Sequence, residues 1–556
     1  MSDVAAPVGR EPLRPASLVP REQSIACPLL LIGLLFGLHS TMVIWRGLNG
    51  DEFWYYSQVE TVARGEWIQP LQTIHTRALF WLAWLDGTEI DHLIIARTLM
   101  MLCLAAIAGA IYATAEFFTD RRTALLAVAA YLGAGFVLQH GTSFRVDPIV
   151  TALLATGLAI VARTRLDWRA IFALGVVIGL AGMVTIKMVL WLPVFAGIAL
   201  WRWHDTEFSR TYPLRWAAAA ITAAAVSAGI YALHSSGASP DANASAASTV
   251  ASAGSKMFGL FHSPYLSLMT KAALISIPLT IAALIVPWTV FRLDLPRGKR
   301  IALLMIWSPL LTPLFYHNSA PYVYVFLLSP VAIVSAFGLR VLTARYGYAL
   351  VAGVIAANAL AVWAVDERDV LPVQETTVDA VHSIFPEPVS YFDCCGMIGS
   401  FKQKNPFMTR WGTEQYLARD SAEYLEAMSQ EPVPLLLDNL GDFTPIFDGG
   451  DERKLHSRDA HALKQTYVNF WGDIYLAGRD VPAGATLEWN VLVPGTYTVQ
   501  GALAIDGKAY RDGAHVELRR NKVAIANTSD ADARLLWGVD PVAPAGEPTR
   551  TEWTGF

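Results

Sequence analysis

Eleven long apolar stretches constrain the fold of this chain more than any other feature. Ordinary soluble domains carry roughly 25% charged residues, whereas this chain of 556 residues is 54% hydrophobic and 16% charged. A helix needs about 20 mostly apolar residues to cross a bilayer, and all but the fourth, sixth and ninth stretches reach about that length. The pattern predicts an α-helical polytopic membrane protein with about 11 transmembrane helices. The stretches lie near residues 28–45, 93–116, 123–140, 148–162, 170–186, 188–201, 216–233, 265–291, 301–315, 322–339 and 346–365.

Lysine and arginine are distributed unevenly between the two sets of connections. If the N-terminus is cytoplasmic, the inside connections hold most of these residues, and the outside connections hold few. Cytoplasmic loops of membrane proteins carry such an excess. We therefore predict a cytoplasmic N-terminus and, because the number of spans is odd, a C-terminal region on the outer side.

The composition divides the chain into three parts. Residues 1–26 are rich in Pro and Arg, lack periodicity and are predicted to be a disordered cytoplasmic tail. Residues 27–365 form the membrane part, with interfacial helices predicted in the first outside connection, 46–92. In residues 366–556 the long apolar runs stop. Alternating strands separated by Pro-Gly and Asp-Gly turns predict an α+β domain that is β-rich after about 465 and contains a β-sandwich.

A second long outside connection, 234–264, is rich in Ala, Ser and Gly and ends in the apolar segment 257–261. Long connections without periodicity are either functional lids or disordered linkers. The sequence leaves both interpretations open.

Charge and cysteine content exclude two classes of protein. The net charge of −5 gives no sign of nucleic-acid binding, and four cysteines are too few for a disulfide framework. Cys27 and Cys103 lie in apolar segments and are predicted to be inert core residues. A bridge between the adjacent Cys394 and Cys395 would be strained and rare.

Asp51 and Glu52 form an acidic pair directly after the first apolar stretch. Carboxylates beside hydrocarbon are costly and are usually functional. The alternative is that both residues merely cap an interfacial helix, since a helix N-terminus favours negative charge. We favour a catalytic role for the pair, with Asp51 as a general base.

Further polar and aromatic residues of the outside connections would face the same compartment as the acidic pair. Each has a structural alternative. Arg145 and Asp147 could form a structural ion pair, and Lys187 could extend to lipid headgroups. Tyr316 and His317 could be interfacial anchors. The prediction of a site depends on the coincidence of these residues on one face. The candidates are Tyr55, Tyr56, His75, Arg77, Arg145, Asp147, Lys187, Tyr316, His317, Tyr322 and Tyr324.

This mixture suits the transfer of a sugar from a lipid phosphate to a hydroxyl acceptor. A carboxylate can take the proton of the attacking hydroxyl, and basic and phenolic donors can stabilise the charge on the departing phosphate. A divalent metal ion, Mg²⁺ or Mn²⁺, could bridge carboxylate and phosphate through Asp51 and Asp147. No dense cluster of Cys, His or acidic residues marks a metal site in the sequence, so metal use is left open.

In its membrane part the chain resembles the GT-C superfamily of glycosyltransferases, in particular the bacterial branch with the lipid A aminoarabinose transferase and the relatives of protein O-mannosyltransferases. The resemblance covers about residues 28–345 and is carried by several short motifs in a fixed order. These are Asp51-Glu52, the segment from Gly65 to Pro70 that is similar to the family's Gly-x-Trp-x-x-Pro loop, Arg145 to Pro148, Lys187, and Tyr322 to Pro330.

The resemblance implies a fold of many helices with two interfacial helices in the first outside loop. It implies that Asp51 is the base and that Asp147 is a second acidic residue that orients the acceptor or a metal ion. The family's Lys-Pro-Pro-type segment is replaced here by His75 to Leu79, so its phosphate role falls to Arg77. The residues that would bind the donor phosphate are Arg77, Arg145, Lys187, Tyr316 and His317, and those that would line the substrate cavity are Tyr55, Tyr56, His75, Tyr322 and Tyr324.

We therefore predict an inverting glycosyltransferase of a bacterial inner (plasma) membrane. It would move a sugar from a polyprenyl-phosphate donor to a periplasmic envelope acceptor such as lipopolysaccharide, a polysaccharide or a protein. Its partners would be the donor, the acceptor and membrane lipids. Two alternatives stay open. A secondary transporter would carry charges near the midplane and broken helices in repeated halves. A non-catalytic envelope assembly protein would use the sandwich as its working part.

Overall fold

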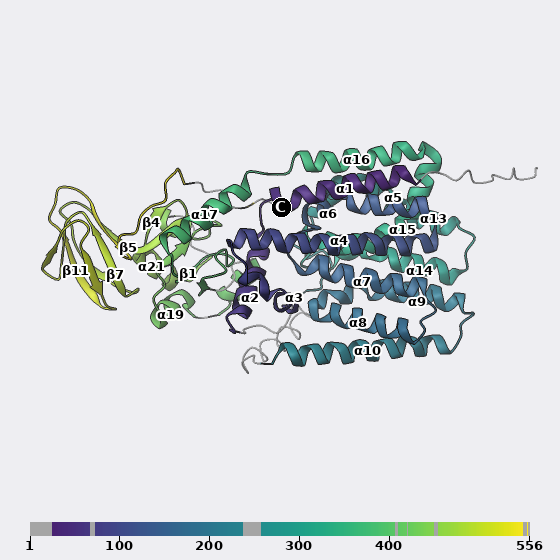
Figure 1. The fold of residues 1–556 in the computed structure, drawn as a ribbon, viewed down its shortest axis with the longest axis horizontal. Helices are drawn as coiled ribbons and strands as arrows, with labels where there is room; N and C mark the ends of the chain where they lie inside the picture. Colours follow the sequence, from purple (N-terminus) through teal and green to yellow (C-terminus); the bar gives the residue numbers. More distant parts are fainter. Residues whose placement is uncertain are drawn as a thin grey trace, which may run out of the picture.

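The computed structural model describes residues 25–66, 73–236, 257–405, 410–419, 421–449, 454–548 and 553. Its long helices lie side by side in one bundle, and a domain of helices and strands lies at one end of that bundle (Figure 1). The predicted tail 1–26 lies outside the described residues except for its last two. Most of the predicted lid or linker, from 237 to 256, also lies outside them.

The bundle confirms the prediction of a polytopic membrane protein. Each of the eleven apolar stretches lies on a helix or on consecutive helices. Within the described ranges, six helices are long and apolar enough to cross a membrane, and a seventh span results if the bent pair α12 and α13 counts as one. The helices are α1 (Ala26–Trp45), α4 (Glu89–Phe118), α5 (Arg121–Leu132), α6 (Gly135–His140), α7 (Val146–Arg163), α8 (Trp168–Val184), η2 (Ile186–Trp191), α9 (Leu192–Asp205), α10 (Thr211–His234), α12 (Leu268–Leu274), α13 (Ile277–Arg292), α14 (Arg297–Trp307), η3 (Ser308–Leu314), α15 (Val323–Tyr346) and α16 (Tyr348–Ala364).

Two breaks between helices lie against each other inside the bundle, where their free backbone groups form hydrogen bonds. One separates α5 from α6, and the other separates α12 from α13, which differ in direction by 101°. The Asn358 amide donates to the carbonyl oxygens of Gly133 (3.0 Å) and Ile275 (2.9 Å). The Gly135 N–H donates to the Ile275 carbonyl and to the Ser276 hydroxyl, both at 3.0 Å. Irregular backbone is tolerated at membrane depth where it finds such partners.

The connection between α1 and α4 contains α2 (Gly50–Ala63), α3 (Ile74–Ala78) and η1 (Phe80–Trp84). That these helices lie in the membrane interface stays a prediction. Part of α2 is buried, including Phe53 and Val59, while Trp84 is 68% exposed. In Figure 1, α2 and α3 lie where the bundle meets the terminal domain. Residues 67–70 of the segment that resembles the Gly-x-Trp-x-x-Pro loop lie outside the described residues.

The terminal domain has the predicted α+β character and carries two sheets. The order of the larger sheet is β10-β7-β12-β5-β3-β1-β2, with β4 also paired to β5, and that of the smaller is β6-β11-β8-β9. The two sheets share an apolar core that includes Trp489, Tyr497, Ile525 and Leu535, so this part is a sandwich. The strands are β1 (Ser390–Phe392), β2 (Lys402–Gln403), β3 (Leu435–Leu437), β4 (Tyr467–Trp471), β5 (Ile474–Val481), β6 (Thr486–Asn490), β7 (Gly495–Gln500), β8 (Leu503–Ile505), β9 (Lys508–Tyr510), β10 (His515–Leu518), β11 (Lys522–Asn527) and β12 (Ala533–Trp537).

Helices cover the half of the larger sheet that is nearer to the bundle. Residues 410–430 hold two helices separated by a short connection. The strand β3 is fully buried. The helices of the domain are α17 (Val370–Ile384), α18 (Arg410–Leu417), α19 (Glu423–Gln430), α20 (Thr444–Asp448) and α21 (Ser457–Thr466).

The terminal domain is bonded directly to the first outside connection. Gln374 of α17 accepts a hydrogen bond from the Leu48 N–H and donates one to the Leu48 carbonyl, both at 2.8 Å. Asp366 accepts from Arg46. The loop 393–400 packs on α2, because a side chain at Gly399 would lie 2.8 Å from the Tyr56 ring. The predicted domain boundary near 366 is therefore a change in composition and not a break in packing.

The cysteines differ in part from expectation. Cys27 is exposed on α1 and Cys103 is half-buried, so the prediction that both are core residues is wrong. Apolar positions of a membrane helix can face lipid as well as the protein core. Cys394 and Cys395 are buried free thiols.

Replacement of Gln374 by Leu should loosen the attachment of the terminal domain. The change leaves the buried N–H and carbonyl of Leu48 without partners, and each such loss costs about 1–3 kcal/mol. We expect the apparent melting temperature in detergent to fall by at least about 3 °C. Gln430→Leu, at an exposed position of α19, is the matched control and should change little. An equal effect of both variants would contradict the prediction.

Candidate active site

The helix α2 begins with a complete capping box at Asn49. The Asn49 side chain accepts a hydrogen bond from the Glu52 N–H, and the Glu52 carboxylate accepts from the Asn49 N–H, both at 3.2 Å. This reciprocal pair satisfies two backbone donors at the start of the helix. The capping alternative for the acidic pair therefore holds for Glu52, and the cap fixes the position of Asp51 one residue earlier.

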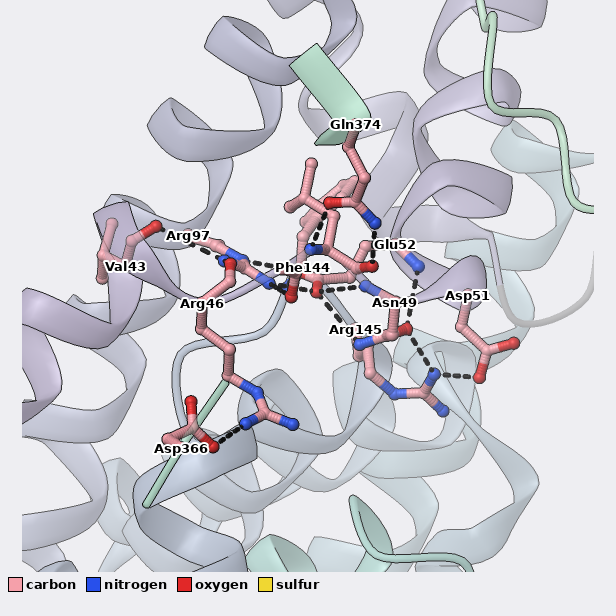
Figure 2. A network of polar contacts seen from close by, with 12 residues as sticks. Val43, Arg46, Asn49, Asp51, Glu52, Arg97, Phe144, Arg145, Asp366 and Gln374 are labelled. Carbon is pink, nitrogen blue, oxygen red and sulfur yellow. Dashed lines mark hydrogen bonds and ion pairs between the residues drawn. The ribbon is translucent and has the colours of Figure 1, made fainter. Parts of the chain in front are cut away.

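Glu52 is also half of a buried ion pair with Arg97 of α4. Arg97 donates through Nε and Nη2 to the two carboxylate oxygens, at 2.8 and 2.6 Å. The Phe144 N–H adds a third donor at 2.8 Å. Neither side chain of the ion pair is more than 2% exposed. Figure 2 shows this carboxylate surrounded by its donors.

Arg97 uses its remaining donors on the backbone between α1 and α2. It bonds the carbonyl oxygens of Arg46 at 2.6 Å and Gly47 at 2.9 Å. These contacts and the ion pair bring together the end of α1, the start of α2, the N-terminal part of α4 and the segment before α7. Because a bidentate guanidinium–carboxylate pair has fixed geometry, this group holds the acidic segment rigidly.

Asp51 points away from that group into a second set of charges. Its carboxylate accepts from Arg145, and the Arg145 Nε lies 3.5 Å from Asp147 Oδ2. Asp147 in turn accepts from Lys187 Nζ at 2.5 Å. The four side chains form an alternating chain of two carboxylates and two cations. Asp51 is its accessible end, with 23% of its side chain exposed, while the other three are 8% exposed or less.

Tyrosines surround the alternating charges. The Arg145 guanidinium lies 3.4 Å from the centre of the Tyr322 ring, and Lys187 Nζ lies 5.7 Å from it. Burial raises the pKa of Tyr322 to about 12, with Arg145 opposing the rise. Burial and the nearby Asp147 carboxylate also raise the pKa values of Tyr55 and Tyr316. All three phenols therefore stay protonated near neutral pH and can act as hydrogen-bond donors.

A cluster of aromatic rings lies beside the charges. The His75 ring of α3 is 4.6 Å from that of Tyr55 and 5.6 Å from that of Phe144, in edge-to-face geometry. Tyr55 follows Asp51 by four residues on α2, and residues with this spacing share a helix face. Two predicted cavity residues, Tyr55 and His75, thus lie together next to the alternating chain of carboxylates and cations.

Other predicted site residues have different surroundings. The Tyr56 hydroxyl bonds Glu60 at 2.7 Å and His92 at 2.5 Å. Arg77 donates to two carbonyl oxygens at the end of α10, both at 3.0 Å. Tyr324 packs its ring on Phe136. The roles predicted for these three residues stay predictions.

His317 belongs to a backbone ladder that joins two outside segments. Its N–H donates to the Met257 carbonyl at 2.9 Å, and its carbonyl accepts from the Ser263 hydroxyl at 2.7 Å. Tyr316 pairs with Phe258 in a β-bridge of the same ladder. Residues 257–263, the end of the predicted lid or linker that the structure describes, are therefore hydrogen-bonded to the segment that carries Tyr316.

Arg97 and Gln374 are structural contributors to the site that the sequence interpretation missed. Arg97 had a visible signal, because it is a permanent charge inside the apolar stretch 93–116, and such charges need a partner. Gln374 had none, because a glutamine in a polar region is ordinary. Its partner Leu48 is separated from it by more than 300 residues.

The carboxylates predicted to bind a metal ion are both paired with cations. The Arg145 guanidinium lies between Asp51 and Asp147, where a bridging ion would have to be. Among the described residues, no group of three or more His, Cys, Asp or Glu side chains is placed to hold a metal. This set of donors suits internal ion pairs better than a divalent ion. A metal requirement stays a prediction, and no step proposed below uses one.

Comparison with solved structures identifies the architecture. The structure of ArnT from Cupriavidus metallidurans bound to undecaprenyl phosphate matches at a TM-score of 0.52 with 13% identity, over 76% of this chain and 95% of that one. Its apo state matches at 0.53 with 12% identity, over 75% and 94%. ArnT is an aminoarabinose transferase of the GT-C class. The chain has the GT-C fold.

Comparisons with family models and with curated proteins found no match, and a further solved structure is a more distant neighbour. No family model matches the sequence. No curated protein matches it either. The apo oligosaccharyltransferase of Archaeoglobus fulgidus matches at a TM-score of 0.47 with 10% identity, over 94% of this chain and 98% of that one. The similarity to the two ArnT structures confirms the GT-C fold that the short motifs indicated.

The two adjacent carboxylates should respond differently to loss of their charge. Glu52→Gln removes half of a buried ion pair, which costs about 3–5 kcal/mol. Asp51→Asn changes a more accessible pair and should cost less than about 1 kcal/mol. We expect a clear fall in the apparent melting temperature for Glu52→Gln alone. Equal melting temperatures of the two isosteric variants would show that the Glu52 pair does not hold the structure together.

Proposed function

We propose that the protein is a glycosyltransferase that moves a sugar from a polyprenyl-phosphate donor to a hydroxyl acceptor. The observation that carries this proposal is the alternating chain Asp51, Arg145, Asp147 and Lys187, whose accessible end is a carboxylate. The GT-C fold adds support, because the ArnT structure that shares it holds undecaprenyl phosphate.

Asp51 acts as the general base. It accepts the proton of the acceptor hydroxyl as the oxygen attacks the anomeric carbon of the donor sugar. The bond from that carbon to the phosphate oxygen breaks, and polyprenyl phosphate leaves with the electron pair. A single displacement of this kind inverts the anomeric configuration. Arg145 is bonded to Asp51 and orients the carboxylate.

Lys187 and Arg145 hold the donor phosphate. Both are buried cations, and cations in a site of low dielectric stabilise a developing anion strongly. The hydroxyls of Tyr322 and Tyr316 lie beside them as neutral donors. Asp147 contacts both cations and positions them. Before the donor binds, Arg145 and Lys187 balance the charge of Asp147, and the same two cations would then contact the phosphate.

Glu52 is a positioning residue in this proposal and not a catalytic one. Its oxygens are taken up by Arg97, by the Phe144 N–H and by the helix cap. Arg77, Tyr56 and Tyr324 contribute more remotely, because their polar atoms or rings contact other elements. His317 supports the site through its backbone.

The reaction takes place on the periplasmic side of a bacterial inner (plasma) membrane, with the N-terminus in the cytoplasm. The distribution of Lys and Arg supports this orientation. The acceptor is a component of the cell envelope, either lipopolysaccharide, another polysaccharide or a protein. The terminal domain lies on the same side as Asp51, since it is bonded to the segment that precedes α2.

The transporter alternative has one observation in its favour, namely the broken helices α5–α6 and α12–α13. Discontinuous helices hold substrates in transporters when their freed backbone groups face a cavity. Here those groups bond Asn358, Ser276 and each other. A non-catalytic assembly protein would need neither the accessible carboxylate nor the buried cations.

Asp51→Asn should abolish sugar transfer and leave donor binding intact. The amide keeps the shape of the carboxylate but cannot take the acceptor proton, and general bases typically contribute 10²–10⁴-fold to the rate. The measurement is the transfer of label from a radioactive polyprenyl-phosphate sugar into envelope material of host membranes. Asp480→Asn, on the far sandwich, is the control. Full activity of Asp51→Asn would rule out the base assignment.

Lys187→Gln should weaken binding of undecaprenyl phosphate by about tenfold or more. Gln keeps a hydrogen bond to Asp147 but loses the charge that makes contacts to phosphate strong. Native mass spectrometry of the detergent-purified protein with added undecaprenyl phosphate measures the change. We expect a smaller loss for Arg77→Ala, since Arg77 Nη1 already bonds two carbonyl oxygens. Unchanged affinity in Lys187→Gln would remove Lys187 from the phosphate site.

A further inference from the structure

His75 is a polar side chain that is buried among aromatic rings. Its side chain is enclosed, with a relative exposure of 5%, and neither ring nitrogen has a hydrogen-bond partner among the described residues. An unsatisfied buried donor or acceptor costs about 1–3 kcal/mol. Buried polar groups without partners are rare in native structures. A phenylalanine would fill the same space among the same rings at no such cost.

His92 provides the contrast within the same region. It is also 5% exposed, but its Nδ1 bonds the Tyr56 hydroxyl at 2.5 Å and its Nε2 bonds the Leu85 carbonyl at 3.1 Å. His92 therefore has the contacts expected of a structural histidine. Within the described ranges, His75 contacts the Tyr55 and Phe144 rings, and neither of its nitrogens has a hydrogen bond.

The position of His75 relates it to the proposed donor site. Tyr55 contacts the His75 ring. Phe144 contacts both of these rings and directly precedes Arg145 in the chain. His75 and Tyr55 therefore lie beside the segment that carries Arg145 and Asp147, and the charge of Asp147 acts on the Tyr55 hydroxyl. A sugar attached to a phosphate held by Arg145 and Lys187 would extend from the phosphate along neighbouring side chains.

The chemistry of the cluster suits a neutral sugar better than an anion. Burial, together with His234, lowers the pKa of His75 to about 3, so the ring is neutral near pH 7. A neutral imidazole offers one donor and one acceptor, and a sugar hydroxyl can bond either nitrogen because it both donates and accepts. The Tyr55 and Phe144 rings supply apolar edges and faces for the C–H groups of a sugar ring.

We propose that His75 is a substrate-binding residue that hydrogen-bonds a hydroxyl of the donor's sugar, with Tyr55 and Phe144 packed against the sugar ring. This inference rests on the proposed function and assigns its sugar subsite. It explains why a residue that costs stability occupies a position where an apolar ring would fit. A site built to bond a hydroxyl also discriminates strongly against sugars that lack it.

The first test compares the stability of His75→Phe with that of His92→Phe. We expect the apparent melting temperature of His75→Phe to equal or exceed that of the wild type, because an unsatisfied polar group is removed. His92→Phe should melt several degrees lower, because it leaves the Leu85 carbonyl without its side-chain donor and removes one of the two hydrogen bonds of the Tyr56 hydroxyl. A fall for His75→Phe as large as that for His92→Phe would overturn the proposal and make His75 a structural residue.

The second test separates binding of the sugar from binding of the lipid phosphate. Native mass spectrometry in detergent would compare undecaprenyl phosphate with its glucose, galactose, mannose and aminoarabinose conjugates. We expect the wild type to prefer at least one conjugate over the bare lipid. His75→Phe should lose about tenfold of that preference, the contribution of one hydrogen bond, and should bind the bare lipid as the wild type does.

The other outcomes are distinct. Retention of the preference in His75→Phe would overturn the assignment of His75. Wild-type binding of the bare lipid without preference for any conjugate would overturn the sugar subsite and leave the proposed donor-phosphate site standing. If the wild type binds none of these lipids, the proposed function itself fails.

Discussion

The buried ion pair between Arg97 and Glu52 is the interaction on which the rest of the site depends. Removing two charges from water is costly, and the cost is offset only when the geometry is good and the remaining donors find partners. Here Arg97 bonds both Glu52 oxygens and the backbone of residues 46 and 47. The pair thus converts the exit of the first membrane helix into a rigid turn. The position of Asp51 depends on that turn.

The terminal domain completes the same turn from the other side. Gln374 occupies both backbone groups of Leu48, and Asp366 bonds Arg46 (Figure 2). The backbone of residues 46–48 is therefore held between a membrane helix and the first helix of the terminal domain. This arrangement means that the terminal domain is part of the scaffold of the candidate site.

The periodicity of α2 sorts the predicted residues into two groups. Consecutive residues of a helix point in directions roughly 100° apart, so Asp51 and Glu52 cannot share a role by adjacency. Asp51 and Tyr55 lie on the face that meets Arg145 and the aromatic cluster. Glu52 and Tyr56 lie on the face that meets α4 and the terminal domain. The four-residue spacing within each pair is visible in the sequence, so the separation of Asp51 and Tyr55 from Glu52 and Tyr56 follows once this segment is taken as a helix.

The lengths of the apolar stretches and the abrupt change in composition near residue 366 predicted the helical membrane bundle and the α+β terminal region from the sequence. These features are local, since the cost of placing a polar residue in hydrocarbon depends on that residue and its neighbours in the chain. The short motifs also indicated the GT-C fold and most of the charged residues at the site. The order of the charges, from Asp51 through Arg145 and Asp147 to Lys187, was decided by tertiary structure. Tertiary structure also decided that Glu52 pairs with Arg97, that His75 is buried among aromatic rings and that Gln374 bonds Leu48. Each of these depends on the rotation and depth of helices that are far apart in the chain, and no single segment of sequence encodes that relation.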